Sequence, residues 1–377
     1  MLVVISSEPD LLVPQPAEIP MNAPLPSLSS LHPLPDNPLV SVIIANHNYG
    51  RFIGMAIDSV LKQTYAPLEL IVVDDGSTDN SREVIEAYGD RLTAIFQDNA
   101  GQGPAFTAGL QQSSGEIICW LDADDYFHPD KVTRVVDALS RHPEWVQLSH
   151  GRVTVDEQGE TIGRDPTLFS QGDVRSLLLE YGRYAWAVTS ALSHRRWVLE
   201  AIAPFPARPQ AADTFITATV PFYGPVGAIG DKLMYRRQHG SNRRARSANV
   251  DYLIEQRKDT RDCINQAARL TDCTHRLDIE RDADYLSYLS VQQNRPSLGR
   301  FVAVLRLTLA EGWSLGQGIK DTLERLIRRG ACAIAPQQGL AIASLGPRRY
   351  LYQKLSLYQK LTSKTAEPSS LPKGQQQ

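Results

Sequence analysis

The sequence has little cysteine: four residues in 377, none of them in a Cys-x-x-Cys spacing. This argues against a disulfide-stapled fold and a zinc site, and predicts free thiols in a reducing compartment. No apolar run reaches the roughly 18 residues that a membrane-spanning helix needs. No basic region precedes the short apolar opening Leu2–Ile5, so no signal peptide is predicted. The motifs GxxxxGK[ST], HExxH and GxSxG are also absent, which excludes the nucleotide hydrolases, zinc proteases and serine hydrolases that carry them.

The composition is that of an ordinary globular protein, with 42% hydrophobic residues, 21% charged residues and a formal net charge of -3. This balance gives no indication of a nucleic-acid partner. The charge is uneven, however. From Arg295 to Lys364 about twelve lysines and arginines stand against three acidic residues, whereas the chain before them is acidic. Two interpretations remain open: a peripheral contact with an anionic membrane, or a solvated basic face on helices that pack against the rest of the protein.

The distribution of prolines and apolar residues predicts four parts. Eight prolines among the first 37 residues, with no apolar period, predict an extended arm that lies outside the fold. The predicted parts are a Pro-rich flexible arm at 1–38, an α/β domain at 39–248, a helical region at 249–364 and a disordered polar tail at 365–377. The α/β domain divides into a nucleotide-binding half at 39–150 and an acceptor half at 151–248.

Short apolar runs alternate with amphipathic segments in the first half of the domain. The runs Leu39–Ala45, Leu68–Val73, Leu92–Phe96 and Ile117–Leu121 are typical of strands buried on both faces. The segments between them repeat apolar residues at helical spacing. The alternation predicts a mostly parallel sheet with right-handed crossovers, in which ligands bind beyond the carboxyl ends of the strands.

Polar clusters follow three of these strands. They are Asn46–Asn48 after the first strand, Asp74 and Asp75 after the second, and Asp122, Asp124 and Asp125 after the fourth. Three carboxylates within four residues repel one another and need solvation, capping or a cation. The last cluster alone is explained equally well by an acidic turn that caps the helix near Pro129 and by a site for a divalent ion. Three polar clusters at one sheet edge favour a site.

The pattern is less regular after His150. We expect a short strand around Val188–Leu192, another at Val226–Ile229, and a basic loop from about Leu233 onward. A Pro-broken linker precedes Asp213, and a capping role for Asp213 at the start of the next helix is the plain alternative to a chemical one.

Four segments resemble, in order, the motifs of family-two glycosyltransferases, which have the GT-A fold. They are Ser41–Ile44 with Asn48-Tyr49, Ser59–Tyr65, Glu69–Asp79, and Leu121–Asp125. Each motif is moderately specific, but the ordered set is very specific. The resemblance runs from Leu39 to Asn242 and does not cover the arm or the C-terminal helices.

The resemblance implies a nucleotide-diphosphate sugar as donor, with Mn²⁺ or Mg²⁺ as cofactor. It places Asp75 at the nucleobase edge with Asp74 in support, Asp122 by the ribose and sugar, and Asp124 on the metal, with His239 completing the metal site. Without the resemblance, His239 would be an ordinary loop histidine. Further donor contacts are expected from residues at the same strand ends and turns, and from one of two arginines that could clamp phosphate: Ala45, Asn46, Asn48, Gly101, Gln102, Ala123, Asp125, Arg236 and Arg237.

The catalytic base implied by the resemblance is Asp213. Many members of the family have Glu-Asp just before this helix, whereas here the pair is Ala212-Asp213, so Asp213 would act alone. Two further departures are Thr107, where Asn is common, and Ala45, where a small polar residue or Pro is usual. Both concern contacts with the donor sugar more than the class of reaction.

The predicted function is an inverting glycosyltransferase that moves a sugar, from a UDP-sugar by default, to a hydroxyl of a saccharide or lipid-linked acceptor. The expected setting is bacterial surface polysaccharide or glycolipid synthesis, in the cytoplasm or at the inner face of the membrane. The alternatives are a nucleotide-sugar-binding GT-A domain without transferase activity and a nucleotidyltransferase, although Asn46–Gly50 lacks the Gly-rich basic turn usual in the latter. An Asp-x-Asp phosphatase would carry its motif on the first strand instead of the fourth.

Overall fold

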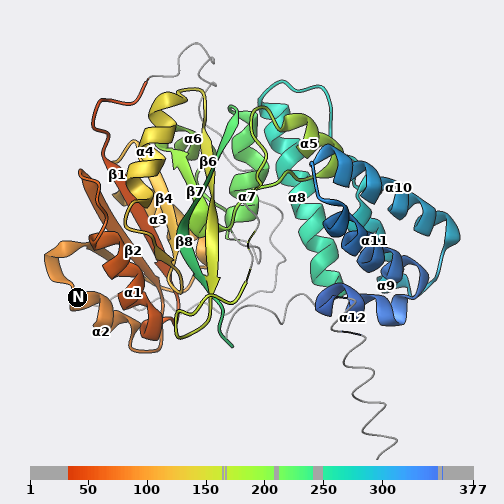
Figure 1. The fold of residues 1–377 in the computed structure, drawn as a ribbon, viewed down its shortest axis with the longest axis horizontal. Coiled ribbons are helices and arrows are strands. Elements are labelled where there is room, and N and C mark those ends of the chain that lie inside the picture. Colours follow the sequence, from red (N-terminus) through yellow and green to blue (C-terminus); the bar gives the residue numbers. More distant parts are fainter. Residues whose placement is uncertain are drawn as a thin grey trace, which may run out of the picture.

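The computed structural model describes residues 33–163, 165, 168–207, 212–240, 249–346 and 350. Most of the predicted arm, residues 241–248 and the predicted tail 365–377 lie outside the described residues. Figure 1 shows a strand-and-helix part beside a group of helices formed by the C-terminal third of the chain. All four cysteines are free, as predicted.

A single eight-stranded sheet forms the centre of the first part, in the order β3-β2-β1-β4-β7-β6-β8-β5. The strands β3, β2, β1 and β4 are parallel to one another, while β7 runs antiparallel to both β4 and β6, and β5 antiparallel to β8. The strands are β1 (Val40–Asn46), β2 (Leu68–Asp75), β3 (Thr93–Gln97), β4 (Ile117–Asp122), β5 (Tyr126–Phe127), β6 (Gln147–Val155), β7 (Leu192–Arg195) and β8 (Val226–Arg237).

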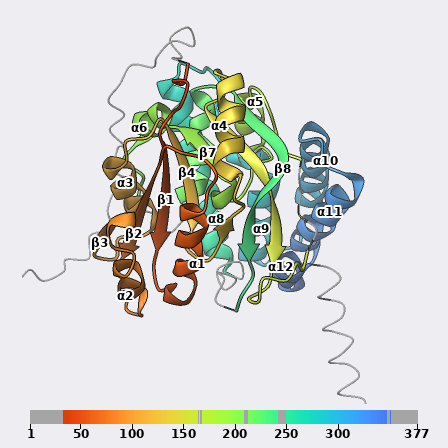
Figure 2. The ribbon, with the colours of Figure 1, turned by 60° about the vertical axis from the view of Figure 1, so that its left-hand side comes forward.

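Helices cover both faces of this sheet (Figures 1 and 2). They are α1 (Gly50–Leu61), α2 (Ser81–Glu86), α3 (Gln102–Gln112), α4 (Lys131–Arg141), α5 (Arg175–Tyr181), α6 (Arg196–Ile202) and α7 (Ala212–Thr219). The central strands are almost entirely buried because their β-branched side chains meet helices on either side. The helix α3 approaches closely at Gly109, where a Cβ atom would lie 2.5 Å from Cγ2 of Ile43.

The described part of the C-terminal third is mainly helical, as predicted. They are α8 (Val250–Leu270), α9 (Ala283–Gln293), α10 (Leu298–Ser314), α11 (Ile319–Ile334) and α12 (Pro336–Leu345). Three of them begin at side chains that accept a hydrogen bond from the first turn: Asn249, Asp282 and Ser297. The helix α8 packs against α7 and α5 and so joins this region to the sheet part. Within the described residues, no helix combines the length and the apolar character needed to cross a membrane.

Two predictions for the second half of the domain were wrong in position. The strand expected at Val188–Leu192 is Leu192–Arg195, because pairing with β4 places Ser193 beside Cys119, and the residues before it form the 3-10 turn η3 (Thr189–Ala191). The strand expected at Val226–Ile229 continues to Arg237. Pairing with β6 extends it through two register shifts, so that Arg236 and Arg237 lie on a strand and not in a loop.

Candidate active site

The register of the sheet brings predicted residues to one edge. Asn46, the last residue of β1, pairs with Asp74 on β2, and Ala45 pairs with Asp122 at the end of β4. These three strands are parallel, so their carboxyl ends meet at the same edge. The second and third polar clusters of the sequence therefore flank β1, the strand that ends in the first cluster.

Asn46 and Asp74 form a buried hydrogen-bonded group with Ser77. The Asn46 Nδ2 donates to Asp74 Oδ1 at 2.6 Å and to Ser77 Oγ at 3.1 Å, and the Ser77 hydroxyl donates to Asp74 Oδ1 at 2.5 Å. Within the described residues, the buried Asn46 Oδ1 has no hydrogen-bond partner. Because buried acceptors are nearly always satisfied, this atom indicates a donor group from a ligand or water.

Asp75 fastens the loop that leads into α3. Its Oδ1 accepts from Gln97 Nε2 at 2.8 Å and from the Ala100 amide at 2.9 Å, and its Oδ2 accepts from the Gly101 amide at 2.8 Å. An ionised carboxylate offers about four acceptor positions. Three are filled by these donors, which leaves capacity for one more.

Asn48 joins the two turns that follow β1 and β2. It adopts a left-handed conformation (φ 61°), which asparagine tolerates better than most residues. Its Oδ1 accepts from the amides of Thr78 at 2.7 Å and Asp79 at 3.3 Å, and its own amide donates to Ser77 Oγ at 2.8 Å. The side chain therefore shapes the edge of the site by holding these turns together.

Gln102, in the first turn of α3, bridges the end of β4 and the start of α7. Its Nε2 donates to Asp122 Oδ1 at 3.3 Å, and its Oε1 accepts from the Ala212 amide at 3.0 Å. Gly101 precedes it with φ 96°, a conformation that favours glycine. Gln102 thus connects the acidic strand end with the helix that carries Asp213.

Asp124 and His239 come together although they are 115 residues apart. The His239 Nε2 lies 2.9 Å from Asp124 Oδ2. The buried imidazole packs against the rings of Phe52 and Tyr49, with centroids 4.7 Å and 5.8 Å away. No group of three His, Cys, Asp or Glu side chains suited to a metal occurs among the described residues. A carboxylate and an imidazole fit Mn²⁺ or Mg²⁺ when diphosphate oxygens and waters complete the shell.

Asp125 lies behind the site, not on its surface. Its Oδ2 accepts from the Ser190 hydroxyl at 2.7 Å and its Oδ1 from the Arg237 amide at 3.0 Å. Burial, together with the negative charge of Asp124, raises the pKa of Asp125 to about 7. The neighbouring Ala123 is also buried. Both residues support the acidic turn from within.

The two arginines of β8 differ in their surroundings. The buried Arg237 guanidinium donates to the carbonyl oxygens of Asp124 at 3.2 Å and Glu157 at 2.8 Å, so it holds the acidic turn in place. Arg236 is half-buried, and its positive charge acts to lower the pKa of Asp125. Of the pair, Arg236 is the one whose guanidinium is not engaged by these carbonyl groups.

Asp213 lies in the first turn of α7. Its Oδ2 accepts from the Thr189 hydroxyl at 3.2 Å, and its Oδ1 lies 3.4 Å from the Thr214 hydroxyl. Thr189 and Ser190 are adjacent in η3, so one short turn contacts both Asp213 and Asp125. Asp213 therefore reaches the edge of the sheet where the acidic cluster lies.

Comparison with known proteins decides the family. A family model described as glycosyl transferase family 2 matches residues 41–179. An uncharacterized glycosyltransferase of Nostoc sp. is 35% identical over 299 residues, which are 74% of this chain and 90% of that protein. The chain belongs to glycosyltransferase family 2. The GT-A architecture predicted from the sequence, a mostly parallel sheet with flanking helices and a helical C-terminal region, is confirmed.

Other relatives cover less of this family-two chain. A glycosyltransferase of Rickettsia typhi is 38% identical over 105 residues, 28% of this chain and 33% of that protein. Among solved structures, S. aureus TarS 1-349 in complex with UDP-GlcNAc has a TM-score of 0.49 at 16% identity, over 83% of this chain and 92% of TarS. The mannosyltransferase PcManGT of Pyrobaculum calidifontis, in complex with GDP-Man and Mn²⁺, has a TM-score of 0.47 at 18% identity, over 82% of this chain and 90% of PcManGT.

Several residues that hold the carboxylates of the candidate active site in place could not be identified from the sequence. The sequence predicts a strand over Thr189 and Ser190, and it indicates no role for Gln97, which follows the third predicted strand. Each acts through a contact with a residue distant in the sequence, so no local pattern marked them. The only sequence signal was their occurrence as polar residues at the border of apolar runs.

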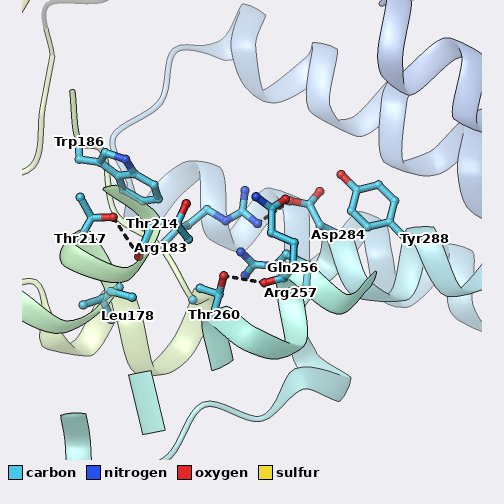
Figure 3. Close-up of a pocket in the computed structure, with 12 residues that line it drawn as sticks. Leu178, Arg183, Trp186, Thr214, Thr217, Gln256, Arg257, Thr260, Asp284 and Tyr288 are labelled. Atoms are coloured by element: carbon cyan, nitrogen blue, oxygen red, sulfur yellow. Dashed lines mark hydrogen bonds and ion pairs between the residues drawn. The ribbon is translucent and has the colours of Figure 1, made fainter. Parts of the chain in front are cut away.

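A cavity of about 220 Å³ lies beside α7, where this helix faces the C-terminal helices (Figure 3). Its walls come from the segment 178–186, from α7, and from α8 and α9 of the C-terminal region. Trp186 stands at one end of the cavity, and Arg183 reaches across it toward Asp284. The cavity therefore lies between the glycosyltransferase part and the C-terminal helices.

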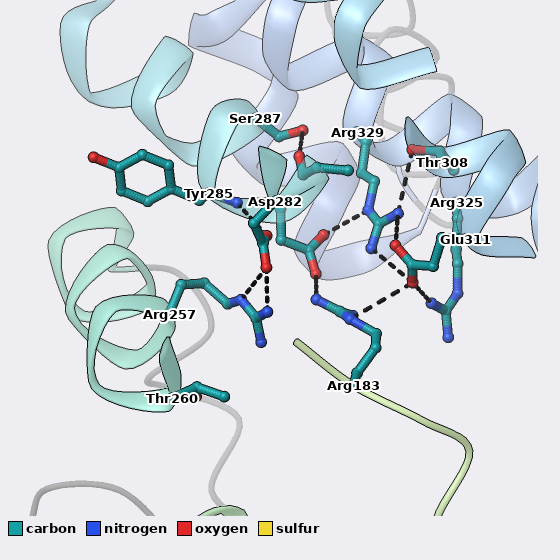
Figure 4. Close-up of polar contacts among 12 residues, drawn as sticks. Arg183, Arg257, Thr260, Asp282, Tyr285, Ser287, Thr308, Glu311, Arg325 and Arg329 are labelled. Carbon is teal, nitrogen blue, oxygen red and sulfur yellow. Dashed lines mark hydrogen bonds and ion pairs between the residues drawn. The ribbon is translucent and has the colours of Figure 1, made fainter. Parts of the chain in front are cut away.

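Buried ion pairs fasten the C-terminal helices to the rest of the chain (Figure 4). Arg183, which follows α5, donates to Asp284 on α9 at 2.5 Å. Asp284 also accepts from Arg329 on α11 at 2.6 Å, and Arg329 donates to Glu311 on α10 at 2.7 Å. Burial alone would raise the pKa of Asp284, but the charges of Arg183 and Arg329 outweigh burial and hold the pKa well below its ordinary value. We call these four residues, with Arg325, the arginine network.

Proposed function

We propose that this chain is an inverting glycosyltransferase that transfers a sugar from a nucleotide-diphosphate sugar to an acceptor hydroxyl. UDP-sugars are the first donors to test, because they are common in the family. Bacterial surface polysaccharide or glycolipid assembly is the proposed setting, with a saccharide or lipid-linked acceptor, and the cytoplasm or the inner face of the membrane is the proposed location.

The observation that carries this proposal is the arrangement of the carboxylates around η3. Thr189 contacts Asp213, while Ser190 donates to Asp125 and accepts from the Asp122 amide at 3.1 Å. An acid on α7 and the acidic end of β4 therefore meet at one turn. An inverting displacement needs both: groups that bind the departing diphosphate, and a base for the incoming hydroxyl.

Donor binding falls to the residues of the sheet edge. Asp75 has one acceptor position left for an N–H of the nucleobase, and the orphan Asn46 Oδ1 can accept a hydrogen bond from the donor. Asp122 and Gln102 lie where the ribose and sugar are proposed to sit, and Arg236 is the proposed phosphate contact. Asp124 and His239 would hold Mn²⁺ or Mg²⁺, which when bound would offset the negative charge of the diphosphate.

Asp213 is the proposed base. It would accept the proton of the acceptor hydroxyl as that oxygen forms its bond to the anomeric carbon and the bond from the anomeric carbon to the diphosphate oxygen breaks. The positive end of α7 favours the ionised carboxylate at neutral pH. The Thr189 contact fixes the carboxylate toward the acidic edge.

Membrane contact is proposed for the helix pair α10–α11. Large apolar residues are exposed along one stripe of each helix: Leu298, Val302, Leu309 and Trp313 on α10, and Ile319, Leu323, Ile327 and Ile334 on α11. The exposed Arg306 and Lys320 lie on the same helices. An apolar face with basic residues beside it suits an anionic lipid surface.

A donor panel tests the transferase proposal. Thermal unfolding would be followed with UDP-, GDP- and dTDP-sugars, each with and without Mn²⁺, because a ligand that binds the native state raises its stability. The expected result is a metal-dependent shift for one nucleotide class, followed by release of the nucleoside diphosphate. If no nucleotide sugar shifts the transition and none is turned over, the proposal is wrong.

A further inference from the structure

We propose that the cavity between α7 and the C-terminal helices is an acceptor subsite that binds an uncharged sugar ring. This inference rests on the proposed function, because an acceptor has a role only if the chain transfers sugar. It adds the location of the acceptor and its chemical class. It also gives the C-terminal helices a part in substrate binding.

The position of the cavity relative to the proposed base supports this assignment. Thr214 lines the cavity and is adjacent to Asp213, and its hydroxyl lies 3.4 Å from Asp213 Oδ1. Thr217, one turn further along α7, also lines the cavity and donates to the Asp213 carbonyl oxygen at 2.7 Å. A ligand held against these threonines lies beside the turn of helix that carries the base.

The lining has the composition of a carbohydrate site. The half-buried Trp186 offers an aromatic surface for the C–H face of a sugar ring, and small polar side chains offer hydrogen bonds to its hydroxyl groups. Gln256 is central to this, because it lines the cavity and, within the described residues, no hydrogen bond engages its side-chain amide. Figure 3 shows Gln256 beside Arg183 and opposite Trp186 and Thr217.

The charge balance of the lining selects an uncharged ligand. The two arginines that line the cavity are already paired: Arg183 with Asp284 at 2.5 Å, and Arg257 with Asp282 at 3.0 Å. An anionic ligand would have to compete with these carboxylates for the guanidinium groups. A neutral polyhydroxylated ligand can hydrogen-bond to the remaining edges of the groups without breaking a pair.

The size of the cavity limits what it can hold. Its volume of about 220 Å³ is below the roughly 300–1,000 Å³ of pockets that hold drug-sized ligands. That is room for one sugar ring and not for an extended oligosaccharide. The rest of a longer acceptor would continue outside the cavity.

Binding of simple glycosides tests the inference directly. The probes are the methyl glycosides of glucose, galactose, mannose and N-acetylglucosamine, with methyl glucuronide as the charged comparison. Saturation-transfer NMR and calorimetry would measure binding to the full chain loaded with the nucleoside diphosphate. The expected result is millimolar binding of at least one neutral glycoside and weaker binding of the glucuronide.

Three variants locate the binding site. Gln256→Ala removes the unengaged amide, and Trp186→Phe shortens the aromatic surface while keeping a ring in the wall. Each is expected to weaken glycoside binding about tenfold and to leave donor affinity unchanged. Gln112→Ala is the control, because it makes the same change as Gln256→Ala at an exposed position at the end of α3. It is expected to leave glycoside binding and donor affinity unchanged.

The outcomes separate the two proposals. If the wild type binds no nucleotide-sugar donor, the proposed function itself is wrong. Donor binding with no detectable glycoside binding overturns the subsite. The same is true if the glycosides bind equally well to wild type, Gln256→Ala and Trp186→Phe, or if the glucuronide binds best.

Discussion

Two clusters of charged side chains lie on either side of α7, and they are held in opposite ways. At the carboxyl edge of the sheet, Asp74, Asp75 and Asp125 accept hydrogen bonds from neutral amides and hydroxyls of the described residues. In the arginine network, Asp284 and Glu311 are bonded to guanidinium groups. The carboxylates of the first cluster thus have neutral hydrogen-bond donors, whereas both carboxylates of the second are paired with arginines.

The difference shows what each cluster is for. Carboxylates that accept hydrogen bonds only from neutral donors still attract a cation or the N–H groups of a ligand. Their mutual repulsion lowers the stability of the fold. Fully paired ions do not attract a ligand, but breaking one pair leaves a buried charge behind. We therefore expect changes at the sheet edge to affect catalysis, and changes in the arginine network to affect stability.

The largest expected effect is on stability, from Arg329→Met. Arg329 is buried and bonded to Asp284, Glu311 and Thr308. Its loss leaves two buried carboxylates with fewer partners, so the free energy of unfolding should fall by about 3–5 kcal/mol. Urea denaturation measures the change, and Arg306→Met on the exposed side of α10 is the control, with an expected change within about 0.5 kcal/mol. Equal stability of the two variants would contradict a structural role for the network.

At the sheet edge, Asp124→Asn should lower activity and leave stability intact, the opposite of the effect expected for Arg329→Met. We expect kcat/KM to fall by roughly 10²–10³-fold, because one of the groups that bind the metal and diphosphate loses its charge. Stability should stay the same or rise, since one of the crowded carboxylates is neutralised. Asp90→Asn, at an exposed position, is the control. Undiminished turnover of Asp124→Asn with saturating Mn²⁺ would remove Asp124 from the metal site.

The sequence predicted the sheet edge better than the arginine network, for a physical reason. Buried parallel strands are continuous apolar runs, so Asp74, Asp75 and Asp122 could be placed at their ends without knowing any long-range contact. The pairs Ser190–Asp125 and Arg183–Asp284 join residues 65 and 101 positions apart. No local periodicity encodes such pairs. Asp125 and Arg237, for which the sequence predicts donor contacts, also form hydrogen bonds within the chain that no local pattern indicates.

Asp213 lies on α7, between the two clusters. Its substitution therefore tests whether α7 takes part in catalysis, as the sheet edge is proposed to do, or only in stability, as the arginine network is. As a base, Asp213→Asn should lower kcat by about a hundredfold, at the low end of general-base effects, and leave donor affinity nearly intact. As a helix cap only, the change should have little effect on either quantity, because Asn caps about as well as Asp. Asp251→Asn in the first turn of α8 is the matched control. Near-wild-type turnover of Asp213→Asn would leave the transferase without its assigned base.

The smallest expected effect concerns the outer face of the C-terminal helices, beyond the arginine network. Trp313 and Ile319 are each 90% exposed at the turn between α10 and α11. If this face rests on a bilayer, the double change Trp313→Ser and Ile319→Ser should weaken binding to anionic vesicles about tenfold, since each side chain loses part of its apolar burial. Flotation with phosphatidylserine vesicles at low and high salt measures this.

The matched control for the bilayer experiment is Leu168→Ser, which removes a side chain that is 75% exposed in the sheet part of the chain. It should leave flotation unchanged, because the expected contact involves only α10 and α11. Wild-type binding should weaken as salt rises, since Arg306 and Lys320 act on the lipid charge through screened interactions. If the wild type does not float, but forms a dimer that the double change dissociates in sedimentation experiments, then a second copy of the chain covers this face and the membrane contact is wrong.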